Sequence, residues 1–319
     1  MISRQHPFFV MFILILVTAS GCIQPQTTIH REDTIPSSAV KYTPADDLFP
    51  PVLHDSSWED PVPVPGDINT AGAEDSPFIP CCDDTTLYFF FTPDVRVPVE
   101  KQVLDGVTGI YVSHKTDDDT WGSVQRVLLQ DADKLALDGC TFVLNNTIWF
   151  CSAREGYTGL HWFTATYDQG SWGSWTLNEF DPAFDVGELH IATNGTTLYY
   201  HSDRAGGKGK HDIWRITYEN GEWRNPTNIE PVNTAEDESL PFLSADGSAL
   251  WFTRWYQGSP AIFRSLCVNN IWQEPQMILS QFAGEPTVDS QGNIYFVHHY
   301  YDGNGTMLEA DLYVAYKKK

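Results

Sequence analysis

The pattern of apolar and polar positions repeats along most of the chain. A short apolar–aromatic core recurs at steps of 61, 50, 52 and 44 residues, and each copy follows a polar turn and a shorter apolar stretch. Two apolar stretches joined by a tight turn of Asn, Asp and Gly residues are typical of a β-hairpin. Each copy therefore predicts the second strand of an antiparallel unit. The copies are Leu87–Phe89, Ile148–Phe150, Leu198–Tyr200, Leu250–Phe252 and Ile294–Phe296.

Further strands are predicted after each copy. A third strand begins with an apolar–aromatic stretch such as Asp212–Arg215 or Ala261–Arg264. A fourth strand opens on a tryptophan in the first four units, at Trp121, Trp172, Trp223 and Trp272. Four short strands per unit with recurring aromatic positions, at repeat lengths of about 40–60 residues, are typical of the blades of a β-propeller. The fold class predicted is therefore all-β.

The two ends of the repeat region complement each other. The fifth unit stops after its third strand, whereas Trp58–Pro61, ahead of the first unit, matches Trp223–Pro226 and Trp272–Pro275. Pairing this N-terminal strand with the last unit would leave no unpaired edge. We therefore expect residues 51–319 to form a single five-bladed β-propeller of four-stranded blades, with the N-terminal strand closing the last blade.

The N-terminus carries the pattern of an export signal. Arg4 precedes an apolar run, Phe8–Val17, which is shorter than the roughly 20 residues that span a bilayer. Residues 1–21 are thus a predicted signal peptide, and Ala19–Cys22 resembles a lipobox, although Ala19 stands where leucine is usual. We expect Cys22 to be lipidated; the alternative is an ordinary signal peptide with a chance cysteine.

The predicted lipid determines the expected location. Residues 22–50 are polar, contain proline and lack periodicity, which predicts a flexible tether. We expect an extracytoplasmic protein that is lipid-anchored to the cell membrane or cell surface, so that one partner is the membrane through the N-terminal lipid.

Charge narrows the range of other partners. The formal net charge is −23, from 42 acidic and 19 basic residues, which opposes binding to nucleic acid or to anionic lipid. No cofactor and no metal are indicated. Asp302–Thr306 resembles part of a calcium loop, but Tyr313 stands where the bidentate glutamate belongs. His298 and His299 are adjacent, so on a strand they point to opposite faces. The partners that remain compatible with the sequence, besides the membrane, are a protein or a carbohydrate ligand.

Several segments of units three and four carry a family resemblance. They are His201–Gly207, Asp212–Trp214, Asn233–Glu238, Ser244–Gly247 and Leu250–Phe252. Together they resemble the WD-like propeller repeat of TolB-type proteins; units one and five match it in part, and unit two keeps the spacing but few of the residues. The resemblance implies a propeller and, more often than catalysis, a binding or scaffolding role. It implies no fixed activity, because fold alone does not set function.

Charged and aromatic residues recur at two points of each unit. Acids occur near the start of the innermost strand, and basic or aromatic residues occur at the end of the second strand. In a propeller the loops at both points lie on one face, around the central channel. The expected ligand-binding residues of this channel-mouth face are Glu74, Asp75, Asp138, Arg154, Glu188, Arg204, Glu238, Arg254, Tyr256, Glu285, His298 and Tyr300.

Three interpretations of this face stay open at the sequence level. It can hold a small or sugar-like ligand, since pockets combine apolar walls with a few polar groups. Its carboxylates can instead cap turns or pair with the arginines. The third interpretation is a glycoside hydrolase in which two of Asp75, Asp138 and Glu188 lie about 5–9.5 Å apart. Because similar acids recur in every unit and no catalytic signature surrounds them, the sequence favours a non-catalytic binding or scaffold module.

One pair of cysteines is a candidate disulfide. If Asn145-Asn146 forms a two-residue turn, Cys140 lies opposite Cys151, with a Cα separation in or near disulfide range. An exported protein meets conditions that keep such a bond oxidised. The alternative is two buried free thiols.

Overall fold

A computed structural model of the protein describes residues 30–131, 134–181, 184 and 186–319. The predicted signal peptide and Cys22 lie outside these ranges. The regular structure of the described chain is almost entirely β-strand, with a 3-10 helix, η1 (Arg31–Thr34), and one short α-helix, α1 (Val99–Gln102). No helix in the described ranges has the length and apolar character needed to cross a bilayer.

The first three repeat units form successive antiparallel sheets. Each begins with its innermost strand and runs outwards, as the cross-strand registers show. The strands of unit one are β3 (Ala73–Phe78), β4 (Thr86–Thr92), β5 (Gly109–His114) and β6 (Gln125–Arg126). Unit two comprises β7 (Ala136–Leu144), β8 (Thr147–Arg154), β9 (His161–Asp168), β10 (Ser171–Trp172) and β11 (Thr176–Leu177). Unit three comprises β12 (Val186–Ile191), β13 (Thr197–Ser202), β14 (Asp212–Glu219) and β15 (Glu222–Asn228).

The last two units follow the same order and take up two short N-terminal strands. Unit four comprises β16 (Glu238–Leu243), β17 (Ala249–Tyr256), β18 (Ser259–Val268), β19 (Ile271–Trp272) and β20 (Gln276–Ser280). Unit five comprises β21 (Ala283–Val288), β22 (Ile294–Tyr301) and β23 (Met307–Ala315). Strand β1 (Val52–Leu53) pairs with β20, and β2 (Val62–Pro63) pairs with β23.

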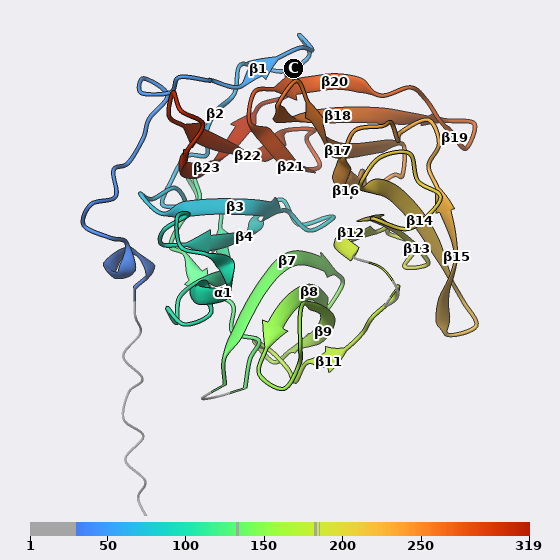
Figure 1. Ribbon diagram of the computed structural model, residues 1–319, viewed down its shortest axis with the longest axis horizontal. Coiled ribbons are helices and arrows are strands. Elements are labelled where there is room, and N and C mark those ends of the chain that lie inside the picture. The colour runs from blue at the N-terminus through green and yellow to red at the C-terminus, as the bar shows by residue number, and fades with distance from the viewer. Residues whose placement is uncertain (1–29, 132–133, 182–183, 185) are drawn as a thin grey trace, which may run out of the picture.

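The sheets radiate from a common centre, as Figure 1 shows. Each innermost strand contacts the next: β3 contacts β7, β7 contacts β12, β12 contacts β16, β16 contacts β21, and β21 contacts β3. The fold is therefore a β-propeller, and its channel is lined by the innermost strands. Near the N-terminus, Trp58 is buried and its indole N–H donates to the Gly292 carbonyl at 2.8 Å.

Every innermost strand contains a β-bulge near its middle. The register against the second strand shifts between Asp75 and Phe78 in unit one, and the other four units shift at the corresponding point. Ser76, Cys140, Leu240 and Glu285 have positive φ angles of 50–57° at this bulge. A bulge inserts an extra residue and re-aims the neighbouring side chains. Residues before and inside the bulge therefore face different surroundings.

The bulge also changes the partner of Cys151. Its cross-strand partner is Gly139, whereas beyond the bulge Phe142 pairs with Trp149 in the register that the Asn145-Asn146 turn predicts. Cys140 and Cys151 are both free thiols. The predicted disulfide thus has no support, because the bulge interrupts the register that the turn sets.

Stacked aromatic pairs lie between the second and third strands. Phe150 stacks on Phe163 and Phe252 on Phe263, with interplanar angles of 27° and 21°. In unit one Phe89 and Tyr111 make the same contact at 25°. These rings are buried, and they form the surface against which the cations of the candidate site are placed.

Candidate functional site

In units two and four, the acid that precedes the bulge is neutralised by an arginine of its own blade. Arg154 Nη2 donates to Asp138 Oδ1 at 2.7 Å, and Arg254 Nε donates to Glu238 Oε1 at 2.6 Å. The Arg154 guanidinium lies 4.5 Å from the Phe163 ring centroid, and the Arg254 guanidinium lies 4.4 Å from that of Phe263. Both acids are buried. Their carboxylates are therefore committed to ion pairs within the fold.

Unit three builds the same arrangement with an acid from the connecting segment. Arg204 Nη2 donates to Asp181 Oδ1 at 2.8 Å, and its guanidinium lies 4.2 Å from the Phe184 ring centroid. The Tyr200 hydroxyl donates to the same carboxylate at 2.7 Å. Asp181 lies outside the set of acids predicted from the repeat, so its role was missed.

Unit one has no arginine at this point, and the N-terminal segment supplies one. We call residues 30–50 the strap. Arg31 of the strap is only 3% exposed, and its Nη1 donates to Glu74 Oε1 at 2.8 Å. Its guanidinium lies over Phe89 and Phe91, at 5.5 and 5.1 Å from their centroids. Burial raises the pKa of Glu74 to about 7, against the opposing effect of Arg31.

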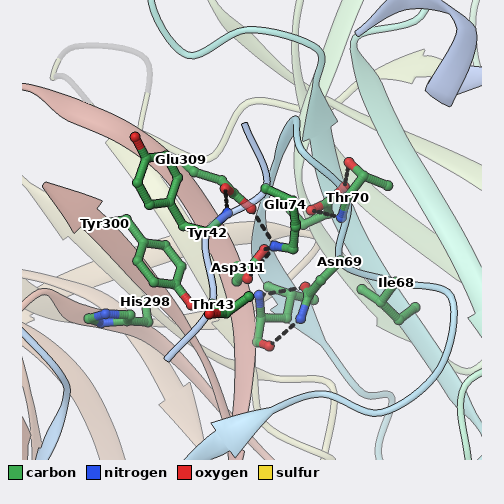
Figure 2. Close-up of polar contacts among 12 residues, drawn as sticks. Tyr42, Thr43, Ile68, Asn69, Thr70, Glu74, His298, Tyr300, Glu309 and Asp311 are labelled. Atoms are coloured by element: carbon green, nitrogen blue, oxygen red, sulfur yellow. Dashed lines mark hydrogen bonds and ion pairs between the residues drawn. The ribbon is translucent and has the colours of Figure 1, made fainter. Parts of the chain in front are cut away.

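Unit five also takes its charged partners from the strap. Lys41 forms ion pairs with the buried Glu309 and Asp311, and the Tyr42 backbone N–H donates to Glu309 Oε2 at 2.7 Å. Figure 2 shows the contact between Tyr42 and Glu309, with His298 and Tyr300 on one side and Glu74 on the other. Burial raises the pKa of Glu309 to about 8, and the Asp311 charge adds to this while Lys41 opposes it.

Two predicted ligand-binding residues are buried beneath this part of the strap. His298 Nε2 is hydrogen-bonded to Asp47 Oδ2 at 2.8 Å, and the Tyr300 ring lies 5.9 Å from that of Tyr42. The Tyr300 hydroxyl is hydrogen-bonded to that of Tyr313 at 2.6 Å. The segment predicted as a tether is thus folded onto the propeller over residues 30–50. The signals for this were Arg31 and Lys41, isolated cations in the segment, and the missing arginine of unit one.

Three other predicted acids meet inside the channel. Asp75, Glu188 and Glu285 come from β3, β12 and β21. The Ser76 backbone N–H donates to Glu285 Oε2 at 2.5 Å, and the Ser76 hydroxyl donates to Glu188 Oε1 at 3.2 Å. Among the described residues, no Lys, Arg or His forms an ion pair with these three acids.

Burial and mutual repulsion favour the protonated forms of these channel carboxyls. Burial raises the pKa of Glu188 to about 8, and the nearby Glu285 carboxylate adds to the effect. The pKa of Asp75 is raised well above its usual range, first by burial and then by Glu285. The pKa of Glu285 is also raised by burial. At neutral pH the cluster can therefore hold protons and donate hydrogen bonds.

The space beside this cluster is small. The cavity has a volume of about 30 Å³, and its walls include Ser76, Glu188 and Glu285. A cavity of this size accepts a water molecule, which needs about 10–15 Å³. The aromatic rings of Phe142 and Phe242 lie 4.8 and 4.7 Å from that of His190 and narrow the channel next to it. In the described residues, no group of three or more His, Cys, Asp or Glu side chains is placed to hold a metal ion.

Two larger grooves flank the tip of the β7–β8 hairpin. One has a volume of about 700 Å³ and includes Tyr167 and Trp172 in its lining; the other, of about 710 Å³, includes Tyr218 and Trp223. Neither groove is lined by a residue of the predicted channel-mouth set. Of that set, Tyr256 remains partly exposed, with its ring 6.1 Å from that of Phe263. The proposed catalytic combination is also divided, since Asp138 pairs with Arg154 while Asp75 and Glu188 line the channel.

Comparison with known proteins gives evidence of fold. No family model matches the sequence, and no curated protein matches it. An endo-arabinase from Bacteroides thetaiotaomicron is similar in structure, with a TM-score of 0.51 and 14% identity over 81% of this chain and 97% of that one. A gluconolactonase from Xanthomonas campestris gives 0.47 and 12% over 88% and 98%, and TolB from Acinetobacter baumannii gives 0.42 and 13% over 79% and 56%. The first of these likenesses supports the β-propeller fold alone.

Proposed function

We propose that this protein is a non-catalytic binding or scaffold module for a protein or carbohydrate ligand. One observation carries the proposal: among the predicted channel-mouth acids, Glu74, Asp138 and Glu238 are paired with arginines, while Glu188 and Glu285 line a cavity of only about 30 Å³. Glycoside hydrolysis requires two carboxyl groups on either side of a bound sugar ring. Pockets that hold small molecules measure about 300–1,000 Å³, so the channel has no room for a sugar between its carboxyls.

A glycoside hydrolase is the second candidate, and the raised pKa of Glu188 favours it. A carboxyl with a pKa of about 8 beside other acids has the protonation state that a general acid needs. For this role the innermost strands would have to separate so that a sugar could reach Asp75 and Glu188.

Activity assays distinguish the two candidates. The purified protein should turn over no aryl-glycoside and no oligosaccharide in a broad panel. Turnover that disappears in Asp75→Asn or Glu188→Gln, with thermal unfolding unchanged, would establish the hydrolase. Glu100→Gln is the control, because Glu100 is an exposed carboxylate on α1 and does not line the channel cavity.

We also propose that the propeller is a ring of five four-stranded blades, which the N-terminal strand closes. The pairing of Val62 with Val314 and of Pro63 with Tyr313 supports this closure, as does the circuit of contacts among the innermost strands. Deleting residues 51–66 should leave β23 without its outer neighbour and cause aggregation. A monodisperse and equally stable deletion variant would count against the closure.

The proposed location is an extracytoplasmic membrane surface, with a lipid on Cys22. Residues 23–29 would then span at most about 25 Å between the lipid and the strap. The anchor would therefore hold units one and five, where the strap is folded down, near the membrane. Cys22→Ser should release the protein from the membrane fraction, and complete retention of that variant would refute lipid anchoring.

A further inference from the structure

The tryptophans that open the outer strands occupy different environments. Trp121 and its N-terminal counterpart Trp58 are 1% and 2% exposed, so they belong to the core. Trp272 contacts Tyr199 of the neighbouring unit edge-on, with ring centroids 6.1 Å apart. Trp172 and Trp223 instead pair with a tyrosine of their own hairpin and line grooves. The same repeat position therefore serves packing in some units and faces open space in units two and three.

The two aromatic pairs have nearly identical geometry. Tyr167 and Trp172 are cross-strand partners with ring centroids 5.1 Å apart and an interplanar angle of 63°. Tyr218 and Trp223 are also cross-strand partners, at 5.1 Å and 60°. The tyrosines are 43% and 44% exposed. Each hairpin thus holds a preformed aromatic surface that is open to solvent and needs little ordering when a ligand binds.

The grooves beside these pairs combine aromatic and hydrogen-bonding groups. Leu144 and Asn145, at the hairpin tip between them, line both grooves. The first groove also presents Asn146, and the second presents Asn178 and Glu179. Ring faces cover the apolar C–H surface of a sugar, while amide and carboxylate groups bond to its hydroxyls. Volumes of about 700 and 710 Å³ lie in the range of ligand pockets.

We infer that the two grooves together bind a neutral glycan chain. Adjacent copies of one aromatic pair, separated by a shared wall, match a polymer whose own units repeat. An anionic polysaccharide is disfavoured by the net charge of −23 and by Glu179 and Glu222 in the second groove. This inference rests on the proposed binding function and names the ligand class and the surface.

Affinity electrophoresis tests the inference with the full-length chain made soluble by Cys22→Ser. The gels contain β-glucan, xylan, arabinan or mannan, with polygalacturonate as the anionic comparison. At least one neutral polysaccharide should retard the protein, and Trp172→Ala and Trp223→Ala should each weaken that binding about tenfold or more. Trp255→Ala is the matched control, since Trp255 is 49% exposed and lines neither groove.

The variants Tyr167→Ala and Tyr218→Ala keep the test decisive if a tryptophan variant fails to fold. Their side chains are more exposed, and thermal unfolding should remain near that of the parent protein. Failure of every neutral polysaccharide to bind, binding that ignores all four substitutions, or groove-dependent binding of peptides in place of glycans would overturn the inference. Hydrolysis of a polysaccharide that binds through Trp172 and Trp223 would support the groove while refuting the non-catalytic function.

Discussion

Glu238 and Glu188 are glutamates near the start of an innermost strand, yet their surroundings differ. Glu238 precedes the bulge of its strand and receives hydrogen bonds from Arg254 at 2.6 Å and from the Thr234 backbone N–H at 2.9 Å. Glu188 lies at the bulge of β12 and faces the channel, where its neighbours are Ser76 and another carboxyl, Glu285. Glu238 is thus neutralised by a cation, whereas Glu188 is neutralised by a proton.

The paired acids extend this comparison to the whole molecule. Units two and four take the arginine from their own second strand, whereas unit one takes Arg31 from the strap. Replacing one side of such a pair leaves a buried charge without compensation, which is more costly than losing a surface ion pair. We therefore expect the strap to contribute to stability as a core element would. We expect the stability contributed by the channel carboxyls to depend on pH.

The largest effect is expected from Arg31→Ala. It should lower the free energy of unfolding by about 3–5 kcal/mol at pH 9, because Glu74, with a pKa of about 7, is then ionised and would stay buried without its cation. Urea unfolding at pH 9 measures the change. Arg96→Ala is the control, since Arg96 is exposed and pairs with Asp94 two residues away, and it should leave the stability nearly unchanged.

A double variant separates the charge effect from lost packing. Arg31→Met with Glu74→Gln removes both charges and retains an apolar side chain over Phe89 and Phe91, so it should recover much of the lost stability. If Arg31→Ala unfolds within about 0.5 kcal/mol of the parent protein, the strap is a loose tether and the pairing of unit one is incidental.

A smaller effect, with a definite pH dependence, is expected from Glu188→Gln. The pKa of Glu188 is about 8 in the fold and near 4.5 when unfolded, so folding favours the protonated acid. Stability is therefore fully present below about pH 4.5 and is lost as the pH rises towards 8. At pH 9 the amide variant should be more stable than the parent protein by about 1–3 kcal/mol, and at pH 5 the two should be nearly equal.

Urea unfolding between pH 5 and pH 9 gives this profile. Glu100→Gln is the control, because Glu100 is exposed on α1 and should leave the profile unchanged. Asp75 and Glu285 still titrate in Glu188→Gln, so the slope should decrease without vanishing. An unchanged slope would mean that Glu188 stays ionised in the fold, and the contrast with Glu238 would fail.

Part of the repeat was readable in the sequence because its side chains make the same backbone contacts in two of the units. Asn233 bonds to the backbone of Ile213 and Asn69 to that of Leu312, and the following threonines bond to Glu238 and Glu74. Such local contacts fix a short motif at a fixed spacing. This is why the strands, the propeller fold and the acids before the bulge were predicted from pattern alone.

The bulges and the strap were not predictable in the same way. A bulge leaves no fixed residue type, since Ser76, Cys140, Leu240 and Glu285 all occupy it with positive φ. From the pattern alone, Glu188 and Glu285 were therefore grouped with Glu74, Asp138 and Glu238, and Cys140 was aligned with Cys151. The strap contacts join residues about 40 to 270 positions apart, such as Arg31 with Glu74 and Lys41 with Asp311. No periodicity connects such distant partners.

The smallest effect is expected from Lys41→Ala. Its side chain is 36% exposed, so solvent screens the pair and the loss should be about 1 kcal/mol. The loss should be greater at pH 9 than at pH 6. Burial raises the pKa of Glu309 to about 8, so at pH 6 this acid is mostly protonated and its ion pair with Lys41 contributes least to stability. The pKa of Lys41 is itself raised by Asp311 and Glu309, although burial opposes this, so the parent side chain stays charged at pH 9. Urea unfolding at the two pH values provides the measurement, and Lys134→Ala, which removes an exposed pair with Glu155, provides the control. Equal losses at both pH values would mean that Lys41 does not act through Glu309, and its contribution would then fall to the pair with Asp311 and to the packing of its aliphatic stem.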